Sequence, residues 1–441
     1  MSSENSFLIK QIIAREVFDS RGNPTIEVEM VSKTGIQARA IVPSGASTGS
    51  NEALELRDQD VHRFHGKGIL KAIRNVQEII YPALKNQDVR DLFSIDKLML
   101  ELDGTPNKAK LGANAILGVS LATAKLAAKV ENRSLYRQIY YFAYEKEQTR
   151  FLLPTPMANV INGGKHAGGK LAPQEFMLMP IGFSDFREAL RAISEIYQTL
   201  KKLLKKRYGP AATNVGDEGG FGSPVDTSKE ALELLIAATE ESGYKVKDEI
   251  SFALDPAASE FYKENNYLID GKALTEGELV DYWFDLINTY PIVSIEDPFH
   301  EESFEGFAEL RRKVADKVQI VGDDLTVTNT KRLELAIQKG SINSLLLKIN
   351  QIGTISEAIT AARLCWKNNY SVVVSHRSGE TEDVSIADLA VGLCTGQIKT
   401  GSIARGERTA KYNQLMRIWD ELGSKAIYAG KNFRTAYKEF I

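Results

Sequence analysis

Short apolar runs recur through the second half of the chain, and each ends on charged or polar residues. They are too short for buried helices and are typical of strands buried on both faces of a parallel sheet. The runs are residues 250–255, 292–297, 318–324, 345–350, 371–379 and 397–401. Between them, apolar residues at steps of three and four predict helices, most clearly from Phe186 to Leu204.

The polar strand ends recur at intervals along the chain. They are Asp255, Glu296, Asp323, Lys348, His376 and Lys399, which lie between 23 and 41 residues apart. A β/α barrel of about 250 residues needs about 30 residues for each strand and helix, so the spacing favours such a barrel. An open doubly wound sheet is the alternative, but it usually carries a glycine-rich fingerprint after its first strand, and the sequence has none there.

The first third of the chain has a different pattern. Apolar and polar residues alternate between residues 7 and 41, with turn residues at 20–24, which predicts a small antiparallel sheet. Helical spacing follows at 71–102 and 113–130. Sheet followed by helices describes an α+β unit, so we predict an N-terminal domain over 1–145 and a barrel domain over 146–441.

Length and composition narrow the class of protein. The 441 residues exceed the about 250–300 at which one core stops growing, which favours two domains. A hydrophobic content of 43% and a net charge of −3 fit a soluble protein and argue against nucleic-acid binding. Cys365 and Cys394 are too few for a disulfide framework, so we expect free buried thiols. We find neither a signal peptide nor the roughly 18 apolar residues of a membrane span, and expect a cytoplasmic protein.

Three carboxylates stand at the ends of successive predicted strands. The carboxyl ends of barrel strands converge on one mouth, so Asp255, Glu296 and Asp323 would become neighbours there. Three carboxylates in one cleft repel one another unless a cation lies among them, and oxygen ligands favour Mg²⁺. A single acid after a strand is more often a helix cap or a salt-bridge partner, and three together weaken that interpretation.

Two lysines and a basic turn follow on the next predicted strands. Lys348 and Lys399 each end an apolar run, and burial beside a metal and another cation lowers the pKa of a lysine, which makes it a usable base. Lysines that reach the rim of the barrel remain the alternative. His376, Arg377 and Ser378 precede Gly379 and offer donors suited to a phosphate or carboxylate.

Two glycine-rich loops precede the barrel strands. Residues 162–170 carry His166 and are followed by Glu175, and residues 216–222 present Asp217 and Glu218 between glycines. Such loops are usually only turns. In front of a metal site and a lysine, they have the character of a lid and a general acid.

These residues fall within longer motifs that resemble the enolase family, whose members dehydrate 2-phosphoglycerate in glycolysis. The motifs are VGDEGGF, SIEDPF, GDDLTVTN, LLLKINQIGT, SHRSGETED and AKYNQL, with DSRGNPT, PSGASTG and LGANAILGVS nearer the start. The resemblance runs from about residue 10 to about residue 420. It implies an α/β protein in which an N-terminal α+β domain caps a C-terminal (β/α)8 TIM barrel with irregular first units.

The resemblance also implies a metal site and a base. Two Mg²⁺ ions are expected, the first held by Asp255, Glu296 and Asp323, and the second arriving with substrate and contacted through Ser47. Lys348 would remove the proton from the α-carbon, which needs strong positive potential nearby because that proton is very weakly acidic.

The remaining expected roles are an acid and a set of substrate ligands. Glu218, oriented with Glu175, would help hydroxide leave, and His166 would belong to a closing lid. Lys399 would meet the substrate carboxylate, and Arg377 and Ser378 the phosphate, with His376 beside them. The family resemblance also implies a homo-oligomer, a dimer or an octamer.

Two other interpretations stay open at this point. One is a protein that retains the fold but acts as a surface adhesin or scaffold without turnover. A secondary surface-bound or secreted pool of the protein is compatible with that interpretation. That class would be expected to lose the metal ligands or the base, and all of them are present. The other is a related enzyme acting on a different carboxylate, which the intact basic turn and the loop around Ser47 disfavour.

Overall fold

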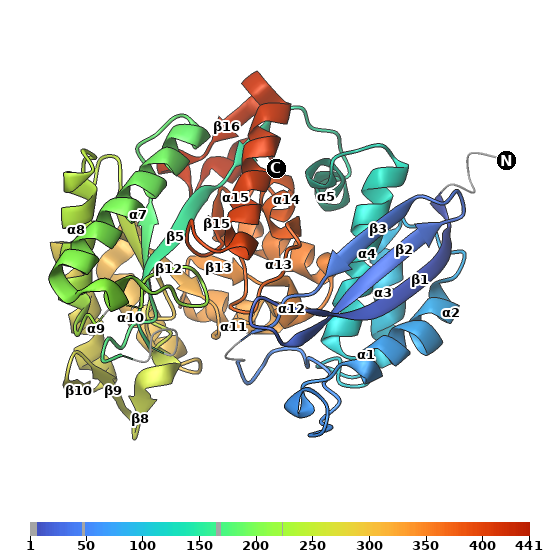
Figure 1. Ribbon diagram of the computed structural model, residues 1–441, viewed down its shortest axis with the longest axis horizontal. Helices are drawn as coiled ribbons and strands as arrows, with labels where there is room; N and C mark the ends of the chain where they lie inside the picture. Colours follow the sequence, from blue (N-terminus) through green and yellow to red (C-terminus); the bar gives the residue numbers. More distant parts are fainter. Residues whose placement is uncertain (1–6, 46–48, 165–168, 223) are drawn as a thin grey trace.

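The computed structural model describes residues 7–45, 49–164, 169–222 and 224–441. An antiparallel sheet and its helices lie beside a closed barrel (Figure 1). Ser47 and His166, which the sequence analysis assigned to metal binding and to the lid, lie outside the described residues.

The N-terminal part is a three-stranded sheet covered by helices. Strands β1 (Ile9–Phe18), β2 (Pro24–Ser32) and β3 (Gln37–Ile41) pair antiparallel in that order, as the alternating pattern predicted. The helices are α1 (Leu70–Asn75), α2 (Tyr81–Leu84), α3 (Leu92–Asp103), α4 (Ala113–Val130) and α5 (Leu135–Tyr144), with a π-helical turn (Val76–Ile80) between α1 and α2. The predicted helix over 113–130 is confirmed, whereas that over 71–102 is interrupted between α2 and α3.

Helix α4 is the core of this part. It packs on β2 and β3, and most of its residues are buried. Among the described residues it is the one helix long and apolar enough to cross a membrane by length and composition. Its burial within the protein is typical of the central helix of a globular domain.

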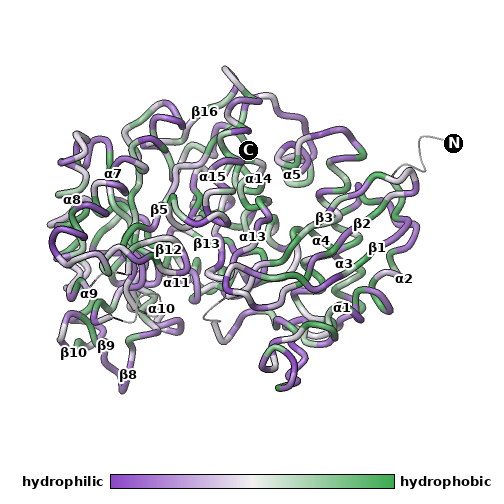
Figure 2. Tube along the Cα trace, in the orientation of Figure 1, coloured by the Kyte–Doolittle hydropathy of each residue, from purple (hydrophilic) through white to green (hydrophobic). Residues whose placement is uncertain are grey.

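The second part is a closed barrel of eight strands. In order around the barrel these are β11 (Ile292–Glu296), β12 (Gln319–Gly322), β13 (Ser344–Leu347), β14 (Ser371–Ser375), β15 (Gln397–Lys399), β5 (Thr155–Asn162), β6 (Glu175–Met179) and β7 (Ser251–Asp255). The six strands predicted from the apolar runs are confirmed as β7 and β11 to β15. The apolar runs show as hydrophobic segments along the barrel, and the turn beside β8 is hydrophilic (Figure 2).

Helices cover the outside of the barrel. They are α7 (Phe186–Tyr208), α8 (Ser228–Glu241), α9 (Glu276–Thr289), α10 (Phe304–Val314), α11 (Thr330–Lys339), α13 (Ile355–Lys367), α14 (Ser385–Gly392) and α15 (Gly406–Leu422), while the short α12 (Ile349–Ile352) lies at the mouth, directly after Lys348. The smaller strands are β8 (Tyr262–Lys263), β9 (Asn266–Ile269) and β10 (Lys272–Leu274), which form one sheet, and β4 (Phe151–Leu153) with β16 (Ala426–Tyr428). Cys365 and Cys394 are buried and free, as predicted.

The barrel departs from a uniform parallel repeat at β5 and β6, which the sequence analysis did not recognise as strands. β6 pairs antiparallel with both β5 and β7. Strands that follow each other without a helix between them run antiparallel, and an apolar run does not reveal its direction. Because β6 is reversed, its first residue, Glu175, lies opposite Asp255, the last residue of β7. Glu175 therefore reaches the same mouth as the carboxyl ends of the other strands.

The N-terminal part contacts the loops at the mouth of the barrel through Ser44 and Ala53. Ser44 and Gly379 exchange backbone hydrogen bonds of 2.8 and 2.9 Å, and the Ala53 N–H donates to the carbonyl of Gln351 (2.8 Å). Only glycine fits at position 379, because a Cβ atom there would lie 2.6 Å from the carbonyl oxygen of Ser44. The loop after β14 is thus bound to the N-terminal part through Gly379.

Candidate active site

A small polar cavity lies at the carboxyl ends of the barrel strands. Its volume is about 40 Å³, and its lining includes most of the residues predicted from the strand ends. The lining residues are Gln174, Glu175, Glu218, Asp255, Ala257, Asp297, Asp323, Asp324, Lys348, Ser375, His376, Arg377, Ser378 and Lys399. Segments that are far apart in sequence therefore meet here, as expected of a β/α barrel.

Lys399 is the centre of one group of charges. Its Nζ atom donates to Asp255 Oδ2 (2.6 Å) and to both carboxylate oxygens of Glu296 (2.8 and 2.9 Å). A third carboxylate, Glu175, lies 3.3 Å away. Burial alone would lower the pKa of Lys399, but these carboxylates hold it well above its ordinary value. Lys399 therefore stays positively charged.

Lys348 has fewer partners than Lys399. It follows β13 directly, and its Nζ atom pairs with Asp323 Oδ2. Burial lowers the pKa of Lys348, but Asp323 and Glu296 outweigh it and leave the pKa raised. The direct contact with Asp323, which the sequence could not reveal, acts against the expected lowering of the pKa of Lys348 beside a metal ion, and that expectation stays a prediction.

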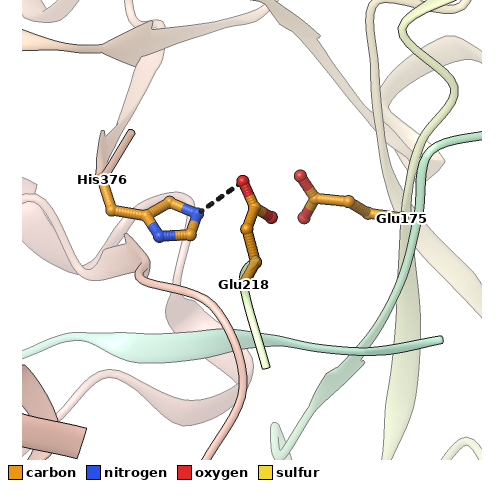
Figure 3. Close-up of side chains that lie close together, drawn as sticks. All are labelled: Glu175, Glu218 and His376. Atoms are coloured by element: carbon orange, nitrogen blue, oxygen red, sulfur yellow. Dashed lines mark ion pairs between the residues drawn. The ribbon is translucent and has the colours of Figure 1, made fainter. Parts of the chain in front are cut away.

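Glu175, Glu218 and His376 form a second group on another side of the cavity (Figure 3). Glu218 lies between the other two side chains, and its Oε1 atom is 3.7 Å from His376 Nε2. Asn159 donates to the other oxygen of Glu218 (3.2 Å). Burial and then the charge of Glu218 raise the pKa of Glu175 well above its ordinary value. A proton is thus favoured in this carboxylate pair.

Arg377 is buried and forms a charge pair with the N-terminal part. Its guanidinium donates to the two oxygens of Glu52 (2.8 and 3.1 Å) and to Asn350 Oδ1 (3.0 Å). Ser378 is also buried beside the cavity. The predicted anion-binding residues are therefore at the site, although Arg377 already contacts a carboxylate.

The acidic groups are arranged so that they could hold a metal ion. Among the described residues, two groups have ligand atoms within 4.8 Å of one another: Glu175 with Glu218 and His376, and Asp297 with Asp323 and Asp324. Of the three predicted carboxylate ligands, Asp323 belongs to the second group, while Asp255 and Glu296 contact Lys399.

The electrostatics of the predicted ligands fit a cation. Burial and the neighbouring Asp255 raise the pKa of Glu296 well above its ordinary value, so a bound cation would favour the ionised form of this carboxylate. Asp255 and Asp323 are buried as well, and all three supply oxygen, the ligand atom that hard divalent cations prefer. The donor set therefore suits Mg²⁺.

Comparisons with known proteins agree with the geometry over both parts of the chain. The family described as "Enolase, N-terminal domain" matches residues 9–139, and that described as "Enolase, C-terminal TIM barrel domain" matches residues 150–437. The chain belongs to the enolase family.

Curated enolases from archaea match nearly the full length. The enolase of Methanocaldococcus jannaschii is 57% identical over 98% of this chain and 100% of its own length. Those of Thermococcus gammatolerans and Pyrococcus furiosus are each 56% identical over the same shares. The resemblance and the fold class inferred from the sequence are thereby confirmed, and the chain belongs with the hydro-lyases of the enolase family. The boundary between 145 and 146 stays a prediction.

The structure adds residues that the sequence analysis did not single out. Gln351 donates to Asp323 Oδ1 (2.8 Å), opposite the oxygen that meets Lys348. Glu52, Asn350 and Asn159 contact predicted site residues, as described above. Asn350 and Gln351 stand two and three residues after Lys348 in an enolase motif, which is a signal that could have revealed them. Glu52 and Asn159 come from distant segments and needed the fold.

Proposed function

We propose that this chain interconverts 2-phosphoglycerate and phosphoenolpyruvate by reversible loss of water. The observation that carries the proposal is the position of Lys348 on one side of the barrel mouth and of Glu175, with its neighbour Glu218, on the other (Figure 3). Lys348 follows β13 and Glu175 begins β6, and these strands are four places apart in either direction around the eight-stranded barrel. A base and an acid that face each other across a cavity suit an elimination from opposite faces of a substrate.

Lys348 is the proposed base. Its amine would take the α-proton, and the electron pair of that C–H bond would pass onto the substrate carboxylate to give a dianionic intermediate. The electron pair would then form the new double bond as the bond from the β-carbon to hydroxyl breaks. The pairing of Lys348 with Asp323 keeps the lysine protonated, so the base must be released from this partner. Neutralisation of Asp323 by a bound divalent cation would lower the pKa of Lys348.

Glu218 is the proposed acid. It would give a proton to the leaving hydroxide, which departs as water. Glu175 lies beside it, and the raised pKa of Glu175 supports a proton shared within this pair. His376 adjoins Glu218 on the other side (Figure 3). This arrangement supplies the proton on the side of the cavity away from Lys348.

The substrate would be held by the basic residues around the cavity. Lys399 suits the substrate carboxylate, because the three carboxylates around it keep its ammonium group positively charged at the cavity. Arg377 and Ser378 suit the phosphate, and Arg377 has a planar fork of donors that can serve an anion beside Glu52. His166 and Ser47 keep their proposed roles in the lid and in holding the second metal ion.

Asp255, Glu296 and Asp323 are the proposed ligands of the first of two Mg²⁺ ions. Mg²⁺ bound there would stabilise the negative charge that develops on the substrate carboxylate when the α-proton leaves. Lys399 adds to that stabilisation. A homo-oligomer, most simply a dimer, and a cytoplasmic location are part of the proposal and follow from the family resemblance and the sequence.

Formation of phosphoenolpyruvate tests the proposal directly. The purified chain is mixed with 2-phosphoglycerate at saturating Mg²⁺, and the ultraviolet absorbance of the product is followed. We expect turnover that stops when the metal is chelated and resumes when Mg²⁺ is restored. Absence of product at saturating Mg²⁺ would favour a scaffold without turnover, and product from another carboxylate in its place would favour a different reaction of this fold.

A further inference from the structure

A buried arginine on α15 joins the two loops that carry His376 and Glu218. Arg408 has no exposed surface, and its Nη2 atom donates to the carbonyls of Ser378 (2.6 Å) and Asp217 (3.0 Å). Its Nη1 atom donates to the carbonyl of Arg377 (2.7 Å) and lies 2.6 Å from His376 Nδ1. The guanidinium thus binds three backbone carbonyls and one imidazole nitrogen.

The contact with the imidazole determines where the ring carries its proton. A guanidinium has only donors and does not lose its proton in proteins. His376 Nδ1 must therefore accept the hydrogen bond and cannot carry a proton itself. The proton of the neutral ring then sits on Nε2, the atom that faces Glu218 Oε1.

The environment of the ring agrees with a neutral imidazole. Burial lowers the pKa of His376 well below its ordinary value, and Arg408 lowers it further, while Glu218 acts in the opposite direction. A doubly protonated ring would place two donors, Arg408 and Nδ1–H, against each other. The ring is therefore held neutral as well as oriented.

We propose that Arg408 is a positioning residue that fixes His376 as the Nε2–H tautomer and so aims a hydrogen-bond donor at Glu218. The importance of this donor for turnover rests on the proposed function, because Glu218 is the proposed acid there. The donor would orient the carboxyl group of Glu218 on the side of the cavity where hydroxide leaves. Arg408 acts through His376 and does not line the cavity.

A second buried cation on the same helix offers a matched control. Lys411 is also fully buried, and its Nζ atom donates to the carbonyl of Thr381 (2.6 Å) and pairs with Glu380 (2.7 Å). It supports the same loop as Arg408 through Thr381 and Glu380, and these partners do not include the His376 ring. Loss of Lys411 should therefore disturb the loop without removing the donor at Nδ1.

The tautomer can be read in the intact protein by nuclear magnetic resonance. The full chain is labelled with ¹⁵N-histidine, and long-range ¹H–¹⁵N spectra separate protonated from unprotonated ring nitrogens. The chain has five histidines, and the spectrum of His376→Gln assigns the signals of His376 by their disappearance. We expect an unprotonated Nδ1 and a protonated Nε2. A protonated Nδ1 in the wild-type protein would overturn the proposal, whether or not the protein has activity.

Two substitutions then test the cause. In Arg408→Met we expect the Nδ1–H form to appear and turnover to fall about 10- to 100-fold, as for a misplaced group at a reaction centre. In Lys411→Met we expect the tautomer to stay as in the wild type. An unchanged Nε2–H tautomer in folded Arg408→Met, or an equal change in both variants, would contradict a specific role for Arg408. If Arg408→Met does not fold, the wild-type spectrum still decides the tautomer, and Arg408→Lys tests whether a single ammonium donor preserves it.

Discussion

The two ends of the barrel interior differ in the kind of polar side chain that is buried there, charged at one end and neutral at the other. At the carboxyl ends of the strands, charged side chains surround the cavity. At the opposite end, the described residues include a group of buried polar side chains that are neutral: Ser294, Gln319, Ser371 and Gln397. Gln319 and Gln397 exchange side-chain amide hydrogen bonds of 2.8 and 3.0 Å, and Gln319 also bonds to Ser294 (3.0 Å) and Ser371 (2.8 Å).

The contrast occurs within single strands. On β15, Gln397 and Lys399 are two residues apart, and on β11 the same holds for Ser294 and Glu296. Residues two apart on a strand share a face, so each strand presents a neutral group and then a charged one to the barrel interior. A neutral hydrogen-bond network in which every group is paired stabilises the fold and does not require a bound ligand. The charged end has acids with raised pKa values, such as Glu175 and Glu296, and is arranged for binding and catalysis.

The largest effect should come from removing the base at the charged end. In Lys348→Ala we expect exchange of the α-proton of 2-phosphoglycerate with solvent to fall by about 10⁴-fold, because no other described side chain is proposed to take that proton. Nuclear magnetic resonance in D₂O measures the exchange. Mg²⁺ binding, followed by calorimetry, should persist because the carboxylates remain. Exchange at nearly the wild-type rate would exclude Lys348 as the base.

Removal of the acid should separate the two halves of the reaction. In Glu218→Gln we expect formation of phosphoenolpyruvate to fall by about 10²- to 10³-fold, since the leaving hydroxide loses its proton donor. Exchange of the α-proton should fall less, because Lys348 is intact. Both rates are measured on the same sample. An equal loss of both would show that Glu218 has no separate role as an acid.

The charged end was the more predictable of the two from sequence. Each apolar run stops at a residue such as Asp255 or Lys399, and this abrupt change from apolar to charged marks a strand end at the barrel mouth. Gln319 and Gln397 begin their strands, and a glutamine at such a position is usually exposed. The sequence therefore does not indicate their network, which only the fold reveals.

Other features could not be read from sequence for physical reasons. The reversed direction of β6, which brings Glu175 to the mouth, depends on pairing with β5 and β7. Arg408 lies within a helix among other charged residues, and its burial depends on contacts with loops 30 or more residues away. Ser47 and His166 stay predictions, as they lie outside the described residues.

A smaller effect is expected from a residue that orients a proposed metal ligand. Gln351 holds Oδ1 of Asp323, so Gln351→Met should weaken the response to Mg²⁺ by about 10-fold, as for other residues that hold metal ligands. Activity is measured across a series of Mg²⁺ concentrations. Gln138→Met is a matched control, because Gln138 is a fully buried glutamine on α5 and does not line the cavity. A similar shift in both variants would rule out a specific effect on Asp323.

The neutral end should respond in stability and not in catalysis. Gln319→Met leaves the amide of Gln397 without its partner, and one unsatisfied buried group costs about 1–3 kcal/mol in the free energy of unfolding. Turnover by the folded protein should stay unchanged, since Gln319 does not line the cavity. Denaturant unfolding and the absorbance assay measure the two quantities.

The double variant Gln319→Met/Gln397→Met sharpens this last test. When both amides are replaced by apolar side chains, the pair is removed as a unit, and neither amide is left buried without its hydrogen-bond partner. The loss of stability should then be smaller than the sum of the two single losses, by about 0.5–3 kcal/mol for residues in contact. Strictly additive losses would mean that the amides do not act as a pair. A purely structural network should change how much protein is folded and leave the turnover of each folded molecule intact. A fall in turnover as large as that in Lys348→Ala would therefore mean that the two ends of the barrel are not independent.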